Sequence, residues 1–344
     1  MGDNQSKTLR TLVIKTEGAS QGTDAVPTTD NHTICFRNVE IQPNIEMSED
    51  SKCANGSHAE SPSIAGIKSA QITADVWLAH SGTDETAPPW FEAFKPCGCG
   101  VIGWDGDSAV AEGSAADGVA LVRRTAYDDA SYTAYVIESE IGSSPVYTIY
   151  KVAGLMGNVT ISQEIGKPAV ASFTYTGKLN DIADGSNIAL NSGMSDQVAE
   201  AFVGQNFTIG GTSAKVQGWS LDLGNEVTPI YNQNDATGIS HYIISSSKPR
   251  FSCNPLAVKQ ATTDWLNIVN SETLQAIKTR AAATGKLQVH VLQGQCMSPA
   301  LAEREGLVSW DLNFKACQNG TPGDLADTDL TLEDTIEILH GTRT

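Results

Sequence analysis

The chain has 344 residues, of which 40% are hydrophobic and 18% are charged, so it can bury a large core and is expected to hold two domains or one duplicated unit. Its formal net charge of −18 argues against a protein that grips nucleic acid, because duplex binding draws its affinity from Lys and Arg side chains that neutralise phosphates. The same charge is compatible with simple solubility, and with a protein past which nucleic acid slides without sticking.

Neither a membrane span nor an export signal is predicted. No apolar run is long enough to cross a bilayer, and residues 1–5 lack the basic and apolar regions of a signal peptide, so export is not expected. The seven cysteines are odd in number and scattered through a large chain, which is typical of reduced thiols.

The first 80 residues alternate between polar stretches and strand-like runs. Residues 1–30 are rich in Gly, Thr and Asp and are expected to form an extended arm followed by a loop. Alternation of apolar and polar residues predicts strands over 33–41 and 67–78. The long polar run 42–63 between them predicts a flexible loop.

A short buried helix is expected after Pro88-Pro89, because Trp90, Phe91 and Phe94 recur at helical spacing and Pro is favourable at a helix start. The run 105–118 consists largely of Gly, Ala, Asp and Ser and is predicted to be a loop. The polar connection 177–205 is interpreted as a linker. Strand-like runs lie between these two segments, over 132–138, 146–152, 158–165 and 169–176.

The segment 214–255 is the one around which we expect the rest of the chain to be arranged. Its first apolar residues are separated by polar ones, as in a half-buried strand, and a second β-rich run begins at Ile239. Residues 232–238 between the runs are rich in Asn, Asp, Gln and Gly, which predicts a long hairpin with a polar tip. Since no catalytic grouping lies on it, we interpret the hairpin as a device for pairing between subunits. The side chains expected to serve it are Val216, Trp219, Leu221, Leu223, Tyr231, Ile239, Tyr242 and Ile244.

The C-terminal third is predicted to contain one helical region and two strands. Residues 264–280 show helical spacing, and Ser271 is expected to cap a second segment that begins at Glu272. The runs 285–292 and 306–316 alternate as strands. The acidic tail 324–337 is interpreted either as a last edge strand or as a solvated end.

The two halves of the sequence show the same order of elements. The numbering offset is about 180 at the first pair and about 140 at the last, which places an insertion in the first half, mostly between Cys99 and Pro145. The order predicts a repeat, although any two all-β domains with one helix share some of it. The matched segments are 37–43 with 218–223, the strands from Gln71 and from Arg250, Trp90-Phe91 with Trp265-Leu266, 147–154 with 287–294, and 169–177 with 308–317.

No motif in the sequence supports an enzyme or a bound cofactor. The run 98–103 matches G-x-G-x-x-G, but it has neither a leading strand nor a trailing helix. Cys97 and Cys99 lack a second pair and a nearby His, so a zinc site is not expected. Asp105 and Asp107 start like a calcium loop whose later positions are not matched. The six histidines are scattered, and none pairs with a nucleophile at a motif spacing.

Four segments together resemble major tail tube proteins of long-tailed, siphovirus-like bacteriophages. They occur in the order of that family and cover most of residues 15–320. They are Glu17-Gly18 through Gly22–Thr28, Asp75–Cys97 with Ser81-Gly82-Thr83 and Ala87–Trp90, Gly157–Ile161 with Pro168 and Phe173–Gly177, and Leu221–Val227.

The resemblance implies a mainly β fold of two tandem β-sandwich or barrel units, each with one flanking helix, whose strands close an inter-subunit β-barrel. The implied domains are an N-terminal arm (1–30), a first unit (31–180) with an insertion around 99–145, a linker (181–205) and a second unit (206–344). Closing a sheet across subunits removes exposed strand edges. Because the chain is about twice as long as one tube unit, a ring of six units needs three chains, a trimer with pseudo-sixfold symmetry. The alternative is a ring of six whole chains.

The resemblance also implies the surroundings of the protein. It places the chain in the tail of a virion, after synthesis in the host cytoplasm, with further copies of itself as lateral and axial partners. Tape measure, tail terminator and baseplate or tip proteins are the other implied partners, with no membrane and no cofactor. DNA would pass through an acidic lumen without tight binding. The rival interpretation is a non-polymerising β-sandwich binding module of the carbohydrate-binding or adhesin type.

Overall fold

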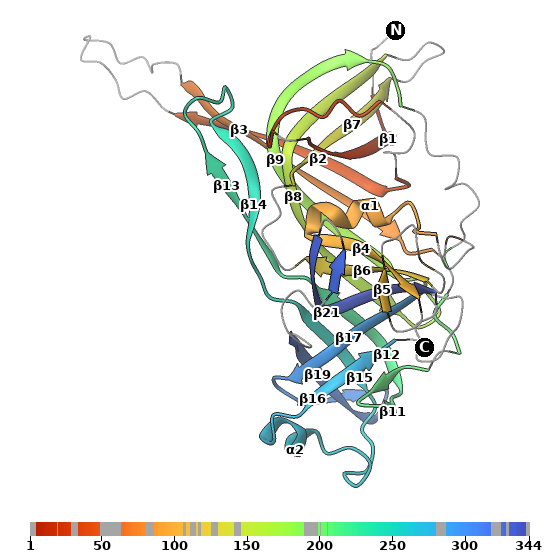
Figure 1. Ribbon diagram of the computed structural model, residues 1–344. Helices are drawn as coiled ribbons and strands as arrows, with labels where there is room; N and C mark the ends of the chain where they lie inside the picture. Colours follow the sequence, from red (N-terminus) through yellow and green to blue (C-terminus); the bar gives the residue numbers. More distant parts are fainter. Residues whose placement is uncertain are drawn as a thin grey trace, which may run out of the picture.

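The computed structural model describes residues 5–18, 20–28, 34–48, 63–79, 81, 86–105, 108–110, 115, 118–124, 130–140, 146–188, 199, 201–204, 206–279, 287–317, 325–327 and 330–341. Antiparallel strands account for most of these residues, and the helical segments are short (Figure 1). The mainly β class predicted from the sequence is therefore confirmed.

Six strands form the sheet in the upper part of Figure 1. Their spatial order is β2-β3-β9-β8-β7-β1, so the first two strands of the chain lie at opposite edges. One face is apolar and closed to solvent, as shown by the buried cross-strand neighbours Ile14, Ala134 and Val152. The strands are β1 (Gln5–Thr16), β2 (Arg37–Ser48), β3 (Ile64–Trp77), β7 (Tyr132–Glu140), β8 (Tyr147–Glu164) and β9 (Val170–Gly185).

A second set of six strands lies in the lower part of the molecule. Its spatial order is β12-β15-β19-β17-β16-β10. Ile209, Ile277 and Val291 are buried cross-strand neighbours at the same place in this order. The strands are β10 (Thr208–Ile209), β12 (Val216–Asp222), β15 (Arg250–Pro255), β16 (Leu274–Lys278), β17 (Leu287–Cys296) and β19 (Leu307–Cys317).

Both sets connect their strands in the same way. When the six strands of a set are numbered along the chain, the spatial order is 2-3-6-5-4-1 in each. A short helix follows the third strand of each set, α1 (Phe91–Phe94) in the first and α2 (Trp265–Asn270) in the second. Each helix covers an aromatic residue of the last strand: the ring centroids of Phe94 and Phe173 are 4.9 Å apart, and those of Trp265 and Phe314 are 6.2 Å apart.

A third group of strands extends the second set. β21 (Leu330–Gly341) pairs with β17 on one side and with β6 (Gly118–Arg124) on the other, and β6 continues to β4 (Cys99–Asp105) and β5 (Ser108–Val110). The insertion predicted in the first half therefore supplies strands beside the second half. The tail is neither an edge strand nor a solvated end, because β21 is paired on both sides. The remaining short strands are β11 (Thr212–Ser213), β18 (Ala300–Arg304) and β20 (Leu325–Asp327).

No closed barrel forms among the described residues. β1 and β2, the two edges of the first set, approach each other where Arg10 Nη1 donates to Val39 O at 3.1 Å. No backbone ladder joins these two strands in the described part of the chain. The guanidinium is held by Glu138, at 2.5 Å, so a charged side chain and not a strand closes this gap.

Several element boundaries differ from the sequence predictions. Residues 5–16, predicted as part of an extended arm, form β1 and pair with β7. The predicted helical region 264–280 ends at Asn270, because Ser271 is its C-cap and Glu272 adopts φ 54°. Residues 274–278 then form β16, since Leu274 and Ile277 find partners on β17. β9 runs to Gly185, into the predicted linker, and part of the predicted loop 42–63 belongs to β2 and β3.

The six described cysteines are free thiols. Burial raises the pKa of Cys97 well above its ordinary value, with a smaller effect from the neighbouring Cys99. Burial also raises the pKa of Cys253, and it raises that of Cys296 to about 11. Cys35 is exposed instead, and Cys53 lies outside the described residues.

We expect brief alkylation of the native protein at pH 8 to modify Cys35 and to leave Cys97, Cys253 and Cys296 unmodified, because alkylation needs an accessible thiolate. Peptide mass spectrometry after quenching measures this, with denatured protein as the control in which all three react. Equal labelling of Cys35 and Cys253 in the native protein would contradict the fold.

Candidate assembly interface

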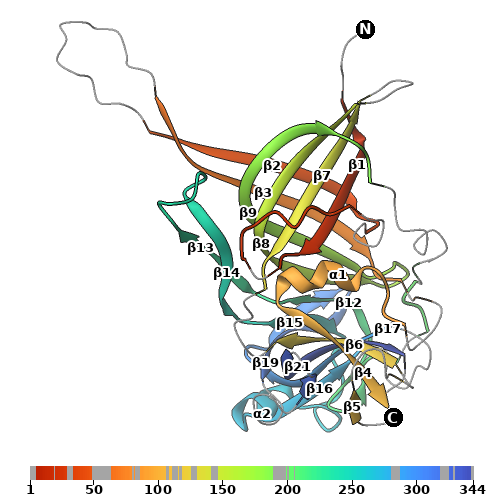
Figure 2. The ribbon, with the colours of Figure 1, turned by 45° about the horizontal axis from the view of Figure 1, so that its top comes forward.

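The predicted hairpin is present and consists of two parts. β12 and β15 pair within the second set, and beyond Gly224 the chain continues as β13 (Asn225–Tyr231) and β14 (Ile239–Ser247), which pair only with each other. The polar run 232–238 is the tip, as predicted. In both ribbon views β13 and β14 rise from the lower part of the molecule along β8 and β9, toward the hairpin of β2 and β3 (Figures 1 and 2).

The eight side chains predicted to pair between subunits do not share one surface. Tyr231 is 66% exposed, whereas Val216 and Ile244 are partly buried. The other five lie in the core of their own chain, so they are not available to another copy in this structure: Trp219, Leu221, Leu223, Ile239 and Tyr242. Alternation in the sequence identified a buried face correctly, but it carries no information on which chain buries it.

The tip of the hairpin is docked onto the first set of strands. Lys178 Nζ on β9 lies 2.7 Å from Asp235 Oδ2, and both side chains are largely shielded from solvent. Lys68 N on β3 donates to Thr237 O at 3.1 Å. These bonds are made where β3 separates from β9, beyond the last paired residues Ser69 and Lys178. The tip therefore fills the fork between two strands of the first set.

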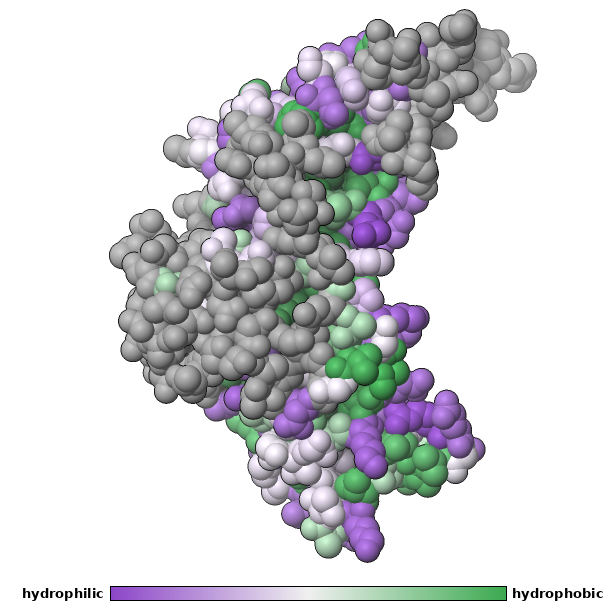
Figure 3. Space-filling view, turned by 90° about the vertical axis from the view of Figure 1, so that its right-hand side faces the viewer, coloured by the Kyte–Doolittle hydropathy of each residue, from purple (hydrophilic) through white to green (hydrophobic). Residues whose placement is uncertain are grey.

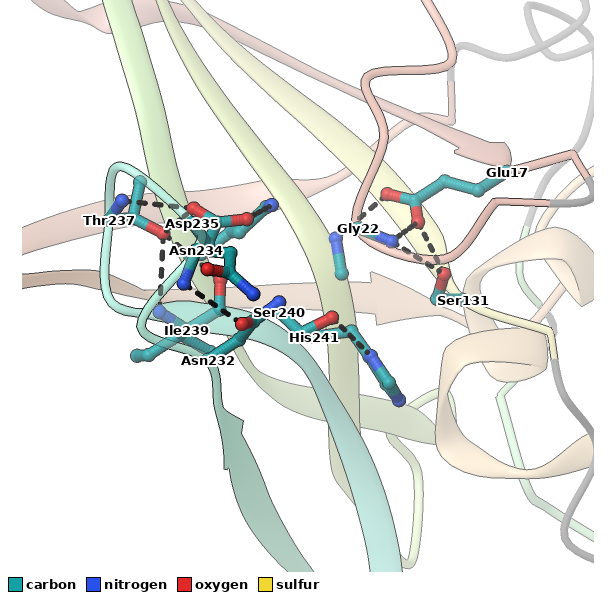
Figure 4. A network of polar contacts seen from close by, with 12 residues as sticks. Glu17, Gly22, Ser131, Asn232, Asn234, Asp235, Thr237, Ile239, Ser240 and His241 are labelled. Carbon is teal, nitrogen blue, oxygen red and sulfur yellow. Dashed lines mark hydrogen bonds and ion pairs between the residues drawn. The ribbon is translucent and has the colours of Figure 1, made fainter.

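The tip is also organised internally. Thr237 donates from its backbone N–H and its hydroxyl to Asp235 Oδ1, at 2.9 and 2.7 Å, and Asn234 N donates to Asn232 Oδ1 at 3.0 Å (Figure 4). Such side chain to backbone bonds let Asn and Asp turn a chain without strand pairing. Asp235 thus serves both the turn and its attachment to Lys178.

A buried carboxylate fixes the loop against which the hairpin lies. Glu17 accepts hydrogen bonds from Gly22 N at 2.5 Å, from Gly154 N at 2.7 Å and from the hydroxyls of Ser131 and Thr133. The Glu17 side chain is 5% exposed, and its four donors compensate for its burial. The sequence gave no signal for this role beyond the Glu17-Gly18 motif, because three of the four donors lie more than 100 residues away.

Two glycines allow β14 to approach this loop closely. A Cβ atom on Gly22 would lie 1.9 Å from Ser240 O, and one on Gly154 would lie 2.7 Å from His241 Cα. Both glycines have positive φ angles, 70° and 60°. Figure 4 shows Ser240 and His241 between the tip and the Glu17 loop. The hairpin is consequently held at its tip and along β14, while the outer edge of β13 pairs with no strand of the described chain.

The two sets of strands are joined by a backbone ladder. β12 of the second set pairs antiparallel with the end of β8 in the first, from Gly218 opposite Glu164 to Asp222 opposite Thr160. Flanking bonds extend it, from Leu223 N to Val159 O at 3.2 Å and from Ile165 N to Gln217 O at 2.8 Å. We call this ladder the β8–β12 junction. One sheet thus continues from the first set into the second.

A groove of about 920 Å³ lies over the β8–β12 junction. It is lined by Trp77, Lys167, Ser220 and Asn313, among others. Trp77 is 42% exposed, and the Arg37 guanidinium lies 3.7 Å from the centre of its ring. The groove therefore presents one aromatic ring, already covered on one face by a cation, among polar side chains.

The other candidate sites find no chemistry in the structure. Gly98 ends the turn η2 (Lys95–Cys97) with φ 79°, and Cys99 begins β4, so the run 98–103 passes from helix to strand, the reverse of a dinucleotide site. Within the described residues, no group of three or more His, Cys, Asp or Glu side chains is arranged to hold a metal ion. Asp107 lies outside them. No helix of the described chain is long and apolar enough to cross a membrane.

No protein-family model matches this sequence, and the curated proteins include no match to it.

Replacing Gly154 with Ala should loosen the docked hairpin. We expect a loss of about 1–2 kcal/mol of stability from the left-handed backbone and about 1–3 kcal/mol more from the clash with His241. Gly166→Ala is the matched control, because Gly166 has φ 79° and open space where a Cβ would lie. Chemical denaturation measures both variants, and hydrogen exchange should accelerate over 239–247 in Gly154→Ala alone. Equal losses for both variants would contradict the close approach.

Acid should weaken the attachment of the tip. Burial by itself raises the pKa of Asp235, but the hydrogen bonds from Lys178 and Thr237 outweigh it and lower the pKa below its ordinary value. A carboxylate with a lowered pKa in the folded state stabilises that state at neutral pH and loses this contribution as the pH falls below about 4.

The difference in Tm between the native chain and Asp235→Asn should therefore be largest near pH 7 and should shrink on acidification. Asp181→Asn is the control, since Asp181 is exposed and lies 3.9 Å from Lys151, and its small effect should vary less with pH. A difference for Asp235→Asn that is constant between pH 7 and pH 3 would argue against the ion pair.

Proposed function

We propose that this chain is a major tail tube protein of a long-tailed bacteriophage, whose rings stack into the tube that conducts phage DNA to the host. One observation carries the proposal: the β8–β12 junction already continues a sheet from one six-stranded set to the next. A tube wall made of such sets needs this contact at every step around the ring. The family resemblance of the four sequence segments points the same way.

We infer that the two sets are tandem tube units. Support comes from their identical strand order and from equivalent register. Ile41, Ile72 and Tyr175 are aligned across β2, β3 and β9, as Leu221, Phe251 and Phe314 are across β12, β15 and β19.

A loop bond is repeated as well. Leu78 N donates to Ala169 O at 3.0 Å in the first set, and Ala257 N donates to Val308 O at 2.9 Å in the second. Chance similarity of two β domains does not account for agreement at this level. On this basis we propose a ring of three chains with six units, in preference to a ring of six chains.

The acidity of the chain is consistent with a conduit for DNA. A net charge of −18 gives a field that repels phosphates, so the nucleic acid would pass without the counterion release that drives tight binding. Partners in the tail, namely tape measure, terminator and tip proteins, follow from the proposed function.

The second candidate function is a non-polymerising binding module. The groove over the β8–β12 junction favours it, because an exposed Trp77 among polar side chains suits a carbohydrate ring. Its partial coverage by Arg37 weighs against it.

The proposed function predicts that purified protein assembles into rings, discs or tubes. Negative-stain electron microscopy and light scattering during size-exclusion chromatography, at 0.15 M salt over a range of protein concentrations, measure this. Class averages with six lobes and a mass of three chains would support the tandem-unit ring. Dispersed monomers at every concentration would refute the tube and leave the binding module, whereas six whole chains per ring would refute the trimer.

A further inference from the structure

The end of the second set repeats the strand that the first set uses at the β8–β12 junction. In the first set, the end of β8 pairs with β9, with Ser162 opposite Val170. In the second set, β18 pairs with β19, with Ala302 opposite Ser309. Since β19 occupies the place of β9, β18 is the counterpart of the end of β8. In the described chain β18 pairs only with β19, whereas the end of β8 also pairs with β12.

Counterpart residues differ in exposure where the junction is missing. Ile161 on β8 is 1% exposed, and its counterpart Leu301 on β18 is 68% exposed. Ala169 is fully buried, and its counterpart Val308 is 58% exposed. Leu301 lies opposite Trp310, and Val308 opposite Glu303, so these apolar side chains share one face of the β18–β19 pair. Figure 3 shows apolar side chains gathered on the lower part of the molecule. An exposed apolar face of this kind marks a contact surface.

The first set carries the complementary edge. β2 is the counterpart of β12, because each is the second strand of its set and pairs with the third. β12 is covered on its other side by β8, but β2 pairs with β3 alone among the described residues. Leu221 on β12 is fully buried, whereas its counterpart Ile41 on β2 is half-buried. One chain therefore holds an unpaired copy of each half of its own junction.

We propose that β18 of one copy pairs antiparallel with β2 of the next copy, repeating the β8–β12 junction between chains. The proposal rests on the proposed function and names its lateral contact. The internal register carries over directly: Leu221 opposite Ile161 and Ser220 opposite Ser162 place Ile41 opposite Leu301 and Glu40 opposite Ala302. Each chain then offers one edge and receives one, so the contact is head-to-tail and closes a ring.

A charge on the receiving side fits this register. Trp219 lies opposite Gln163 in the internal junction, which sets Glu303 of one copy opposite Val39 of the next. Arg10 donates to Val39 O, and its Nε atom is buried with no hydrogen-bond partner in the described residues. A carboxylate arriving at this point supplies an acceptor beside an under-satisfied guanidinium. In the single chain, Arg10 caps the edge and so limits unspecific strand pairing.

The register is tested by cysteine cross-linking in the full chain. Glu40→Cys combined with Ala302→Cys should form disulfides between copies under mild oxidation, because directly opposite residues on antiparallel strands have the spacing that a disulfide needs. Non-reducing electrophoresis should show a ladder of linked chains that ends at three. The chain with native cysteines alone gives the background, since Cys35 is exposed.

Two variants serve as controls. Ser162→Cys with Ser220→Cys reports the internal junction and should give a disulfide within one chain, with no linked copies. Gln42→Cys with Ala302→Cys is displaced by two residues and should cross-link at least tenfold more slowly.

The outcomes separate this inference from the function on which it rests. Rings or tubes in which the Glu40/Ala302 pair stays unlinked, while the internal control forms its disulfide, would overturn the β18–β2 contact and leave the tube function standing. Equal cross-linking of the displaced pair would overturn the register. Absence of both assemblies and cross-links would overturn the function as well.

Discussion

The β8–β12 junction is the interaction on which the rest of the structure depends. Backbone groups at the end of β8 and along β12 have no other strand to bond, and an unpaired buried N–H or C=O costs as much as a lost hydrogen bond. Their ladder fixes the two sets of strands relative to each other, and it buries Ile161, Trp219 and Leu221 beneath it. The same contact defines what the two ends of the chain lack.

The hairpin β13–β14 shows how a projecting element can be held without joining the main sheet. It forms a separate two-stranded sheet, and an isolated pair of strands is marginal in water. Its stability comes from Asp235 and Thr237 at the tip and from the close approach of β14 to Gly22 and Gly154. The attachment points all belong to the first set, so the hairpin also ties the two sets together at a distance from the β8–β12 junction.

Local signals in the sequence predicted local structure well. Alternation around Trp219 and the polar run 232–238 were sufficient to predict the hairpin, and the Trp90 cluster was sufficient for α1. The two-residue strand β10 and the five-residue strand β16 were missed, because strands so short exist only through their partners. The docking of Asp235 onto Lys178 and the position of Glu17 depend on contacts between distant residues, which periodicity does not encode. The acidic tail misled for the same reason: Glu337 is buried beside His290, 3.6 Å away.

The position of β21 has a consequence for how the protein is made. This strand lies between β17 and β6, and β6 is synthesised some two hundred residues earlier. A ribosome must therefore produce residues 330–341 before β6 and β17 acquire their shared neighbour, so neither half can complete its sheet during most of translation. Pairing of such distant segments is slow and leaves edges open meanwhile. Premature sticking between nascent copies is thus a hazard that the late arrival of β21 brings to an end.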